Sequence, residues 1–253
     1  MLQDLVNLNL FAFFLIFARV GAAFLLLPGY SAAYVSPNIR LALALGVSFA
    51  VMPLLADTLP TLPAAPSALA LLLVGETVIG SFFGLLARIL LGALQTAGTM
   101  IALFASLSNA FIQDPIAEQQ SSTVSGFLTT LGIVVIFATN LHELMLKAVV
   151  DSYMLFAPGQ PLVIGDLSDT IARQVADSFA LGLQLAAPFL VVALTYYIGL
   201  GILGRLMPTL QVFFFGLPVQ IALQIWVMMI AISGIMMVFM TRFQDSFVPF
   251  LGQ

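Results

Sequence analysis

The sequence predicts an all-α membrane protein. Of its 253 residues, 62% are hydrophobic and only 7% are charged, and the mean hydropathy is +1.15. A soluble domain of this composition would expose large apolar patches to water. Several apolar runs reach the roughly 20 residues that a helix needs to cross a bilayer. A helical membrane domain is therefore the expected fold.

The first apolar run, 5–27, contains a single charge, Arg19. Turn residues at 28–37 separate it from a second and shorter run, 41–55. Three prolines in 57–66 then predict an extended, exposed connection, because proline cannot continue a helix.

Two adjoining runs, 69–91 and 92–111, have no turn signal between them. They are compatible with one long helix or with two helices joined near Gly92. A fourth long run follows at 127–150, and the Pro- and Gly-containing stretch 152–176 predicts a second loop. Within it, Ser168 is a candidate cap for a short amphipathic lead-in to the next helix.

The run 180–203 contains Pro188, which predicts a kink. The last run, 210–240, is too long for one untilted span, and Gly216 and Pro218 are expected to divide it. We therefore expect about six hydrophobic helices, several of them broken into hairpins. They form a single membrane domain over residues 1–253.

The charge distribution excludes some classes of function. Seven Lys and Arg residues and a net charge of -4 leave no basic patch for nucleic acid. No arrangement typical of a catalytic triad or a carboxylate pair is present, so we expect no enzyme and no metal or cofactor. His142-Glu143 lacks the second histidine of an HExxH zinc site, because Leu146 stands in its place.

Positive charges do not define an orientation. Arg40, Arg173, Arg205 and Arg242 lie in predicted loops, but Arg205 and Arg242 bracket one long apolar segment. This conflict suggests that some segments are half-spans or hairpins, buried against other protein chains more than against lipid.

Arg19 lies well inside an apolar run, where an arginine costs about 2.5 to 3.5 kcal/mol on insertion scales. It therefore needs a partner, and Glu76 is the obvious acidic candidate. Two interpretations stay open: a structural pairing with a carboxylate or with helix-end carbonyls, or an ion or proton pathway.

One face of the third helix combines small and charged residues. Glycine or a charged residue occurs at every fourth position there, and charges lie at both ends of the glycine pair in a GxxxG pattern. This pattern predicts close helix packing and indicates an assembly surface. The face contains Glu76, Gly80, Gly84, Arg88 and Gly92, and Gly98 continues the set of small packing residues.

A polar stretch, 98–126, interrupts the apolar sequence. Most polar connections are wet loops, but 104–112 is too apolar and too rich in small residues to lie in water. Asp114-Pro115 predicts a turn at the tip. The candidate gate residues in this stretch are Ser106, Ser108, Asn109, Phe111, Ile112, Gln113, Asp114, Pro115, Glu118 and Gln119.

In their order and spacing, residues over almost the whole chain resemble the FliR family of type III export proteins, whose virulence-system counterparts are SctT, YscT and SpaR. The matching residues are Phe17-Ala18-Arg19, Gly21, Pro28, Pro37, Arg40, Glu76, Gly80, Gly84, Gln95, Ala97, Gly98, Asp114-Pro115, Asn140, His142, Pro188, Leu203-Gly204-Arg205, Pro208, Gln211-Val-Phe-Phe and Gly216-Leu-Pro218.

The resemblance implies a non-enzymatic subunit of the flagellar export gate in the bacterial inner membrane, within the flagellar basal body. One copy would complete a helical complex with FliP and FliQ, which FlhB surrounds and FlhA drives. The complex would pass unfolded flagellar proteins, with 106–121 as a plug in the central pore. Arg19, Glu76 and Arg88 would be satisfied across subunits, and Arg40 and Arg205 are further candidates for assembly.

Two other functions remain as alternatives. One is an SctT-type subunit of an injectisome, although the Gln211-Val-Phe-Phe segment favours the flagellar system. The other is a small ion-coupled transporter that uses Arg19 and Glu76 as a coupling pair. A transporter of that kind is favoured by an inverted repeat, and the sequence shows none.

Overall fold

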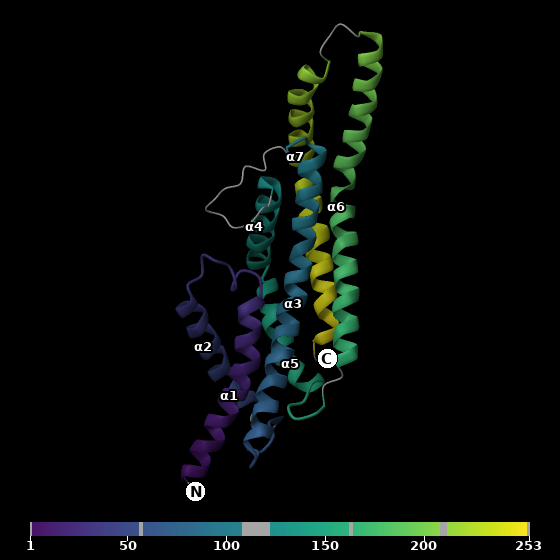
Figure 1. Ribbon diagram of the computed structural model, residues 1–253. Helices are drawn as coiled ribbons and strands as arrows, with labels where there is room; N and C mark the ends of the chain where they lie inside the picture. The colour runs from purple at the N-terminus through teal and green to yellow at the C-terminus, as the bar shows by residue number, and fades with distance from the viewer. Residues whose placement is uncertain (1, 56–57, 108–121, 162–163, 208–211, 252–253) are drawn as a thin grey trace. The chain divides into compact units, whose positions relative to one another are not determined.

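The structure is a computed structural model that describes residues 2–55, 58–107, 122–161, 164–207 and 212–251. These residues form seven α-helices and one short 3-10 helix, with no strand among them (Figure 1), which confirms the predicted all-α class. In chain order the helices are α1 (Leu2–Leu26), α2 (Pro37–Leu55), α3 (Pro66–Phe104), α4 (Thr123–Ala138), α5 (Leu141–Leu155), α6 (Ile164–Leu206), α7 (Val212–Phe247) and η3 (Val248–Phe250).

Most of these helices are long and apolar enough to cross a membrane. Within the described residues, α2, α3, α6 and the part of α7 from Gly216 onward meet this condition. The pair α4 and α5 meets it together but is bent by 73°. The described side chains of α1 add a shorter apolar helix, Leu10–Leu26. With the bent pair counted once, the described residues form six apolar helical segments.

Contacts within the chain group into two compact units. Unit 1 comprises Met1–Ile89, Ile136–Gln174 and Phe243–Gln253, and unit 2 comprises Leu90–Val135 and Val175–Arg242. The boundaries fall inside α3, α4, α6 and α7, so these helices contribute to both units.

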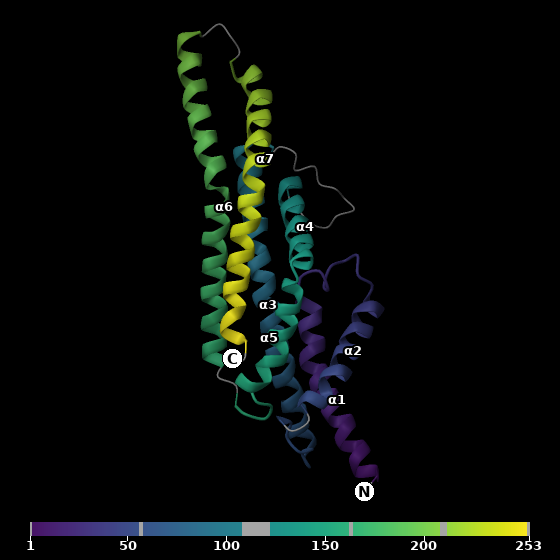
Figure 2. The same cartoon turned by 180° about the vertical axis from the view of Figure 1, so that it is seen from behind.

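Unit 1 is built on the packing of α1. Helix α1 lies beside α2 as a hairpin in both views (Figures 1 and 2). The other face of α1 meets α3 at very short range, because a methyl group at Gly80 would overlap the Arg19 carbonyl oxygen and one at Gly84 would overlap the Leu26 Cβ. The GxxxG pattern thus lets two helices of the same chain approach each other.

Unit 2 uses small residues in the same way. A methyl group at Gly98 of α3 would overlap the Ser125 backbone of α4, and one at Gly132 of α4 would overlap the Leu94 side chain. Gly182 brings α6 against Ala93 and Thr96 of α3. Figures 1 and 2 show α6 and α7 side by side within this unit.

Three sequence-based boundaries are corrected. The run 127–150 does not form one helix, because Asn140 takes a left-handed conformation (φ 59°) that ends α4 and starts α5. The bend packs against the turn after α1: the Phe137 ring contacts Tyr30 at 5.4 Å between centroids, and at Gly29 (φ +81°) a Cβ would overlap that ring. An aromatic contact and a glycine therefore hold the break in place.

The second predicted loop is shorter than expected, because α5 continues to Leu155 and α6 already begins at Ile164. Its charged residues lie on the first turns of a helix, where Asp169 and Arg173 form an exposed i,i+4 ion pair of 2.7 Å. Helix α7 also runs through Gly216 and Pro218 without division, and α3 is one helix through Gly92.

Candidate functional site

The most buried charge of unit 1 is Arg19. Its side chain is fully buried, and Glu76 on α3 is 2% exposed. The guanidinium Nε donates to Glu76 Oε2 at 2.7 Å and an Nη2 proton to Glu76 Oε1 at 3.1 Å, so the pair is bidentate. Nη1 donates to the Ser152 hydroxyl at 2.9 Å, and Nη2 also donates to the Phe156 carbonyl at 2.8 Å.

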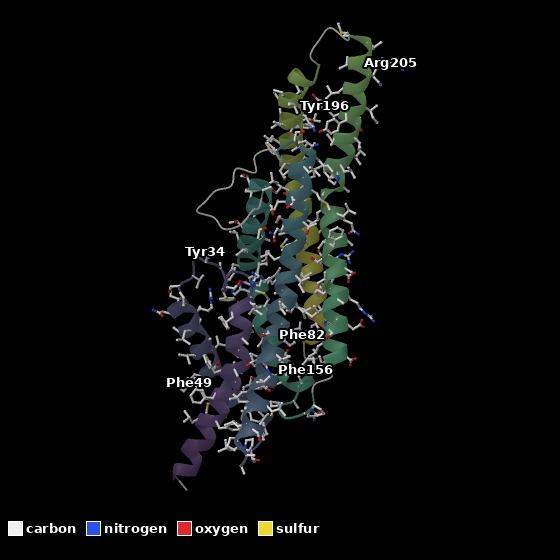
Figure 3. The ribbon with its side chains drawn as sticks, in the orientation of Figure 1. Tyr34, Phe49, Phe82, Phe156, Tyr196 and Arg205 are labelled. Atoms are coloured by element: carbon white, nitrogen blue, oxygen red, sulfur yellow. The ribbon has the colours of Figure 1, made fainter. Side chains whose placement is uncertain are left out.

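Aromatic residues contribute to the packing in this region. The guanidinium carbon of Arg19 lies 3.7 Å from the centroid of the Tyr153 ring, a favourable cation–π contact. Phe82 of α3 and Phe156, which follows α5, lie close together in Figure 3, with 6.4 Å between their centroids. Three helices are thus tied together around one buried ion pair.

The geometry of the cluster favours the structural interpretation of Arg19 over an ion pathway. Four hydrogen bonds occupy four of the five N–H donors of a guanidinium. All partners of Arg19 and Glu76 named here lie within this chain. The expectation that these two charges are satisfied across subunits is therefore corrected.

The other predicted charges lie elsewhere. The Arg88 side chain is exposed on α3, and among the described residues it has no ion-pair partner. Arg40 lies at the start of α2, and its side chain donates to two backbone carbonyls of the preceding turn. Arg205 is exposed near the end of α6 (Figure 3). At Gly92 a Cβ would meet open space, in contrast to Gly80, Gly84 and Gly98.

The polar stretch begins at a hydrogen-bond network in unit 2. Ser106 has a left-handed backbone (φ 57°), and its hydroxyl lies 3.1 Å from the Tyr197 hydroxyl of α6. Gln220 of α7 donates to the same hydroxyl at 2.9 Å and to the Phe104 carbonyl at 2.7 Å. This end of the stretch is therefore held by side chains from two other helices.

A second hydrogen bond joins the same two helices. The Tyr196 hydroxyl of α6 (Figure 3) donates to the Gly216 carbonyl of α7 at 2.7 Å. This bond helps to hold α6 and α7 together, the two helices that carry Tyr197 and Gln220.

The far end of the polar stretch is fixed by serines. The Ser125 amide donates to the Ser122 hydroxyl at 3.1 Å, a helix cap for α4. The Ser122 hydroxyl donates to the Gly98 carbonyl at 3.4 Å, and the Ser125 hydroxyl donates to the Gln95 carbonyl at 3.1 Å. Both ends of the stretch are thus bonded to the last turns of α3.

An apolar cavity of about 590 Å³ lies in unit 2 beside these two ends. It is lined by residues of α3, α4 and α7 together with Ala105 and Leu107, and the polar residues in its lining are Thr123 and Gln224. Gln224 is 2% exposed and donates to the Phe189 carbonyl at 3.1 Å. The cavity places an apolar surface next to the start and the end of the polar stretch.

Most of the predicted gate residues cannot be placed. Ser106 is described, but the others lie outside the described residues. These are Ser108, Asn109, Phe111, Ile112, Gln113, Asp114, Pro115, Glu118 and Gln119.

Sequence reasoning missed the residues that hold these sites together. They are Ser122, Ser125, Ser152, Tyr153, Tyr197, Gln220 and Gln224. The sequence signal that could have identified them is a polar side chain within an apolar run, because such a side chain in a membrane helix needs a hydrogen-bond partner.

Comparison with known proteins gives a consistent result. The family model described as "Bacterial export proteins, family 1" matches residues 10–246. The chain is 35% identical over 231 residues to the flagellar biosynthetic protein FliR of Caulobacter vibrioides, covering 91% of this chain and 92% of that protein. It is 30% identical to FliR of Escherichia coli over 83% of this chain and 80% of that protein. It is 26% identical to the Yop proteins translocation protein T of Yersinia pestis, over 88% and 86% of the two chains.

Proposed function

This chain belongs to the FliR family of bacterial export proteins, and we propose that it is a core subunit of the type III export gate. It is a membrane protein of the flagellar export system. In the proposed role one copy joins FliP and FliQ in the inner membrane at the flagellar basal body. FlhB and FlhA complete the apparatus, and unfolded flagellar proteins are the cargo. The whole chain, 1–253, acts as one functional domain.

The observation that carries this proposal is the exposed surface of the long helices. In the most apolar 18 residues of α2, α3, α6 and α7, no more than 39% are buried inside the chain. Lipid or other protein chains must therefore cover most of this surface. Unit 1 and unit 2 both present apolar side chains of this kind, including Phe49 of α2 and Trp226 of α7.

Exposed polar residues on these helices distinguish a protein partner from lipid. Arg88 and Gln95 of α3 and Gln184 of α6 are exposed within apolar segments. Hydrocarbon offers no hydrogen bonds to such groups, whereas a neighbouring subunit can. The exposed Arg88 therefore favours a neighbouring protein subunit over hydrocarbon at this face of α3.

Co-expression tests the assembly. The full chain is co-expressed with FliP and FliQ, and the mass of the purified complex is determined. We expect a heteromeric complex containing one copy of this chain. Arg88→Leu should reduce co-purification of FliP and FliQ. The control is Arg173→Leu, which removes an arginine that is paired with Asp169 in water and should leave assembly intact.

A homodimer of this chain alone would contradict the export-gate proposal. An intact complex from the Arg88→Leu variant would contradict only the assigned role of Arg88.

We further propose that 106–121 is a gate that closes the pore when no cargo is passing. The support is the arrangement of its two ends, which the Ser106–Tyr197–Gln220 network and the Ser122 cap attach to firmly packed helices. With both ends held in this way, the proposed gate can open and close while the packing of the surrounding helices is unchanged.

The gate is tested by replacing Ile112–Gln119 with a Gly-Ser segment of equal length. We expect cells carrying the variant to leak ions while secretion continues or loosens, because the ends stay in place and the side chains of the plug are lost. A potential-sensitive dye measures the leak. Normal membrane potential together with normal export would refute the gate.

The similarity to the Yersinia translocation protein favours a second candidate, an injectisome subunit. Complementation of a non-motile strain that lacks its FliR protein separates the two. Restored motility supports the flagellar role, and restored effector secretion in an injectisome mutant without restored motility supports the alternative.

A further inference from the structure

An open groove of about 340 Å³ lies in unit 1 between α1 and α2 and reaches Thr77 of α3. Its walls are almost entirely apolar and include Phe17, Gly21 and Leu25 of α1 and Leu41 of α2. Leu25 and Leu41 are each at least half exposed. Ligand pockets in proteins begin at about this volume.

Among the residues that the structure describes, Arg40 is the one charged residue that lines the groove. Its Nε donates to the Tyr30 carbonyl at 2.9 Å and its Nη2 to the Ala32 carbonyl at 3.3 Å, and both acceptors are neutral. Among the described residues, no carboxylate forms an ion pair with Arg40. The groove thus joins an apolar floor to a cation for which the described residues supply no carboxylate partner.

We propose that this groove binds an anionic phospholipid, with one acyl chain along the apolar floor and the phosphate at Arg40. Basic groups beside grooves between membrane helices are suited to acidic headgroups. The site is independent of the role in export.

The surface that continues from the groove favours lipid over a partner chain. Leu41, Leu45 and Phe49 follow one another at every fourth position of α2 and are all exposed. This stripe is uniformly apolar, and it therefore offers a second protein no polar contact that would fix its register. An acyl chain needs none.

Native mass spectrometry of the full-length chain tests the site. The protein is purified in detergent and incubated with equal amounts of phosphatidylglycerol and phosphatidylcholine of the same acyl length. We expect wild type to retain phosphatidylglycerol over phosphatidylcholine by roughly fivefold, the preference that one basic residue supplies at an acidic headgroup.

Three variants separate the parts of the site. Arg40→Gln should abolish the preference, and Arg40→Lys should keep it because the charge remains. Gly21→Leu should lower retention of both lipids by filling the groove, since a Cβ there meets only the Phe17 ring at 3.6 Å. Arg88→Gln removes an exposed arginine elsewhere and should leave the lipid ratio unchanged.

An unchanged lipid ratio in Arg40→Gln would overturn the proposal, as would equal retention of both lipids by wild type. Displacement of the lipid by inorganic phosphate alone would also overturn it, since the acyl chain would then contribute nothing. Thermal unfolding of each variant identifies any loss of lipid binding that comes from misfolding. Arg40→Lys serves as a folded variant with the same charge at this position.

Discussion

Replacement of Glu76 by glutamine removes the negative charge of the buried pair while keeping its shape. The Arg19 cation then stays fully buried with no counter-charge among the contacts described for it. Breaking a buried ion pair by removing one partner costs about 3 to 5 kcal/mol. For a protein of this size, about 2 to 4 °C of melting temperature corresponds to 1 kcal/mol. We therefore expect a decrease of roughly 6 to 20 °C.

The assay is thermal unfolding of the protein in detergent. Its readout is the fraction of protein that remains monodisperse after heating to each temperature. Asp169→Asn is the matched control, because it makes the same chemical change in an exposed i,i+4 pair worth about 0.3 to 0.5 kcal/mol. A double variant, Arg19→Met with Glu76→Leu, should be milder than Glu76→Gln because no unpaired charge remains.

Two results would refute this reasoning. One is a decrease for Glu76→Gln no larger than that for Asp169→Asn. The other is a double variant whose loss equals the sum of the losses of Arg19→Met and Glu76→Leu measured singly, since additivity would mean that the two residues do not interact.

Three further predictions concern packing and backbone. Gly80→Ala should lower the free energy of unfolding by about 1 to 3 kcal/mol, because the added methyl group overlaps the α1 backbone. At Gly92 the added methyl group meets open space, so Gly92→Ala should raise the free energy of unfolding by up to about 1 kcal/mol. Thermal unfolding measures both changes. Asn140→Val should cost about 1 to 2 kcal/mol at its left-handed backbone, and Asn140→Gly should be tolerated in the same assay. Tyr197→Phe removes the hydroxyl that bonds both Ser106 and Gln220, so both hydrogen bonds are lost, each worth about 0.5 to 1.5 kcal/mol. We expect faster limited proteolysis within 108–121, and equal cleavage rates would contradict the proposed anchoring.

The sequence alone predicted the fold class and most helix positions, because a span of apolar residues long enough for the bilayer is a strong signal. It failed at Asn140, where no glycine or proline marks the break between α4 and α5. It also failed at 164–176, because charged residues on the exposed turns of α6 resemble a loop in composition.

Partner choice was harder to predict than the need for a partner. The cost of a buried arginine showed that Arg19 required an acceptor, and Glu76 was a reasonable candidate. Ser152 and Phe156 could not be identified, since they lie 133 and 137 residues further along the chain. Contacts over such separations depend on the tertiary arrangement and leave no local pattern.

The same separations have a consequence for the synthesis of the chain. Arg19 precedes Glu76 by 57 residues and Phe156 by 137. At about 5 to 20 residues per second, the ribosome makes Glu76 roughly 3 to 11 s after Arg19 and Phe156 roughly 7 to 27 s after it. During that interval the first helix carries a cation that only later helices can neutralise. A chain that ends before residue 76 carries that charge without the carboxylate that pairs with it in the folded protein.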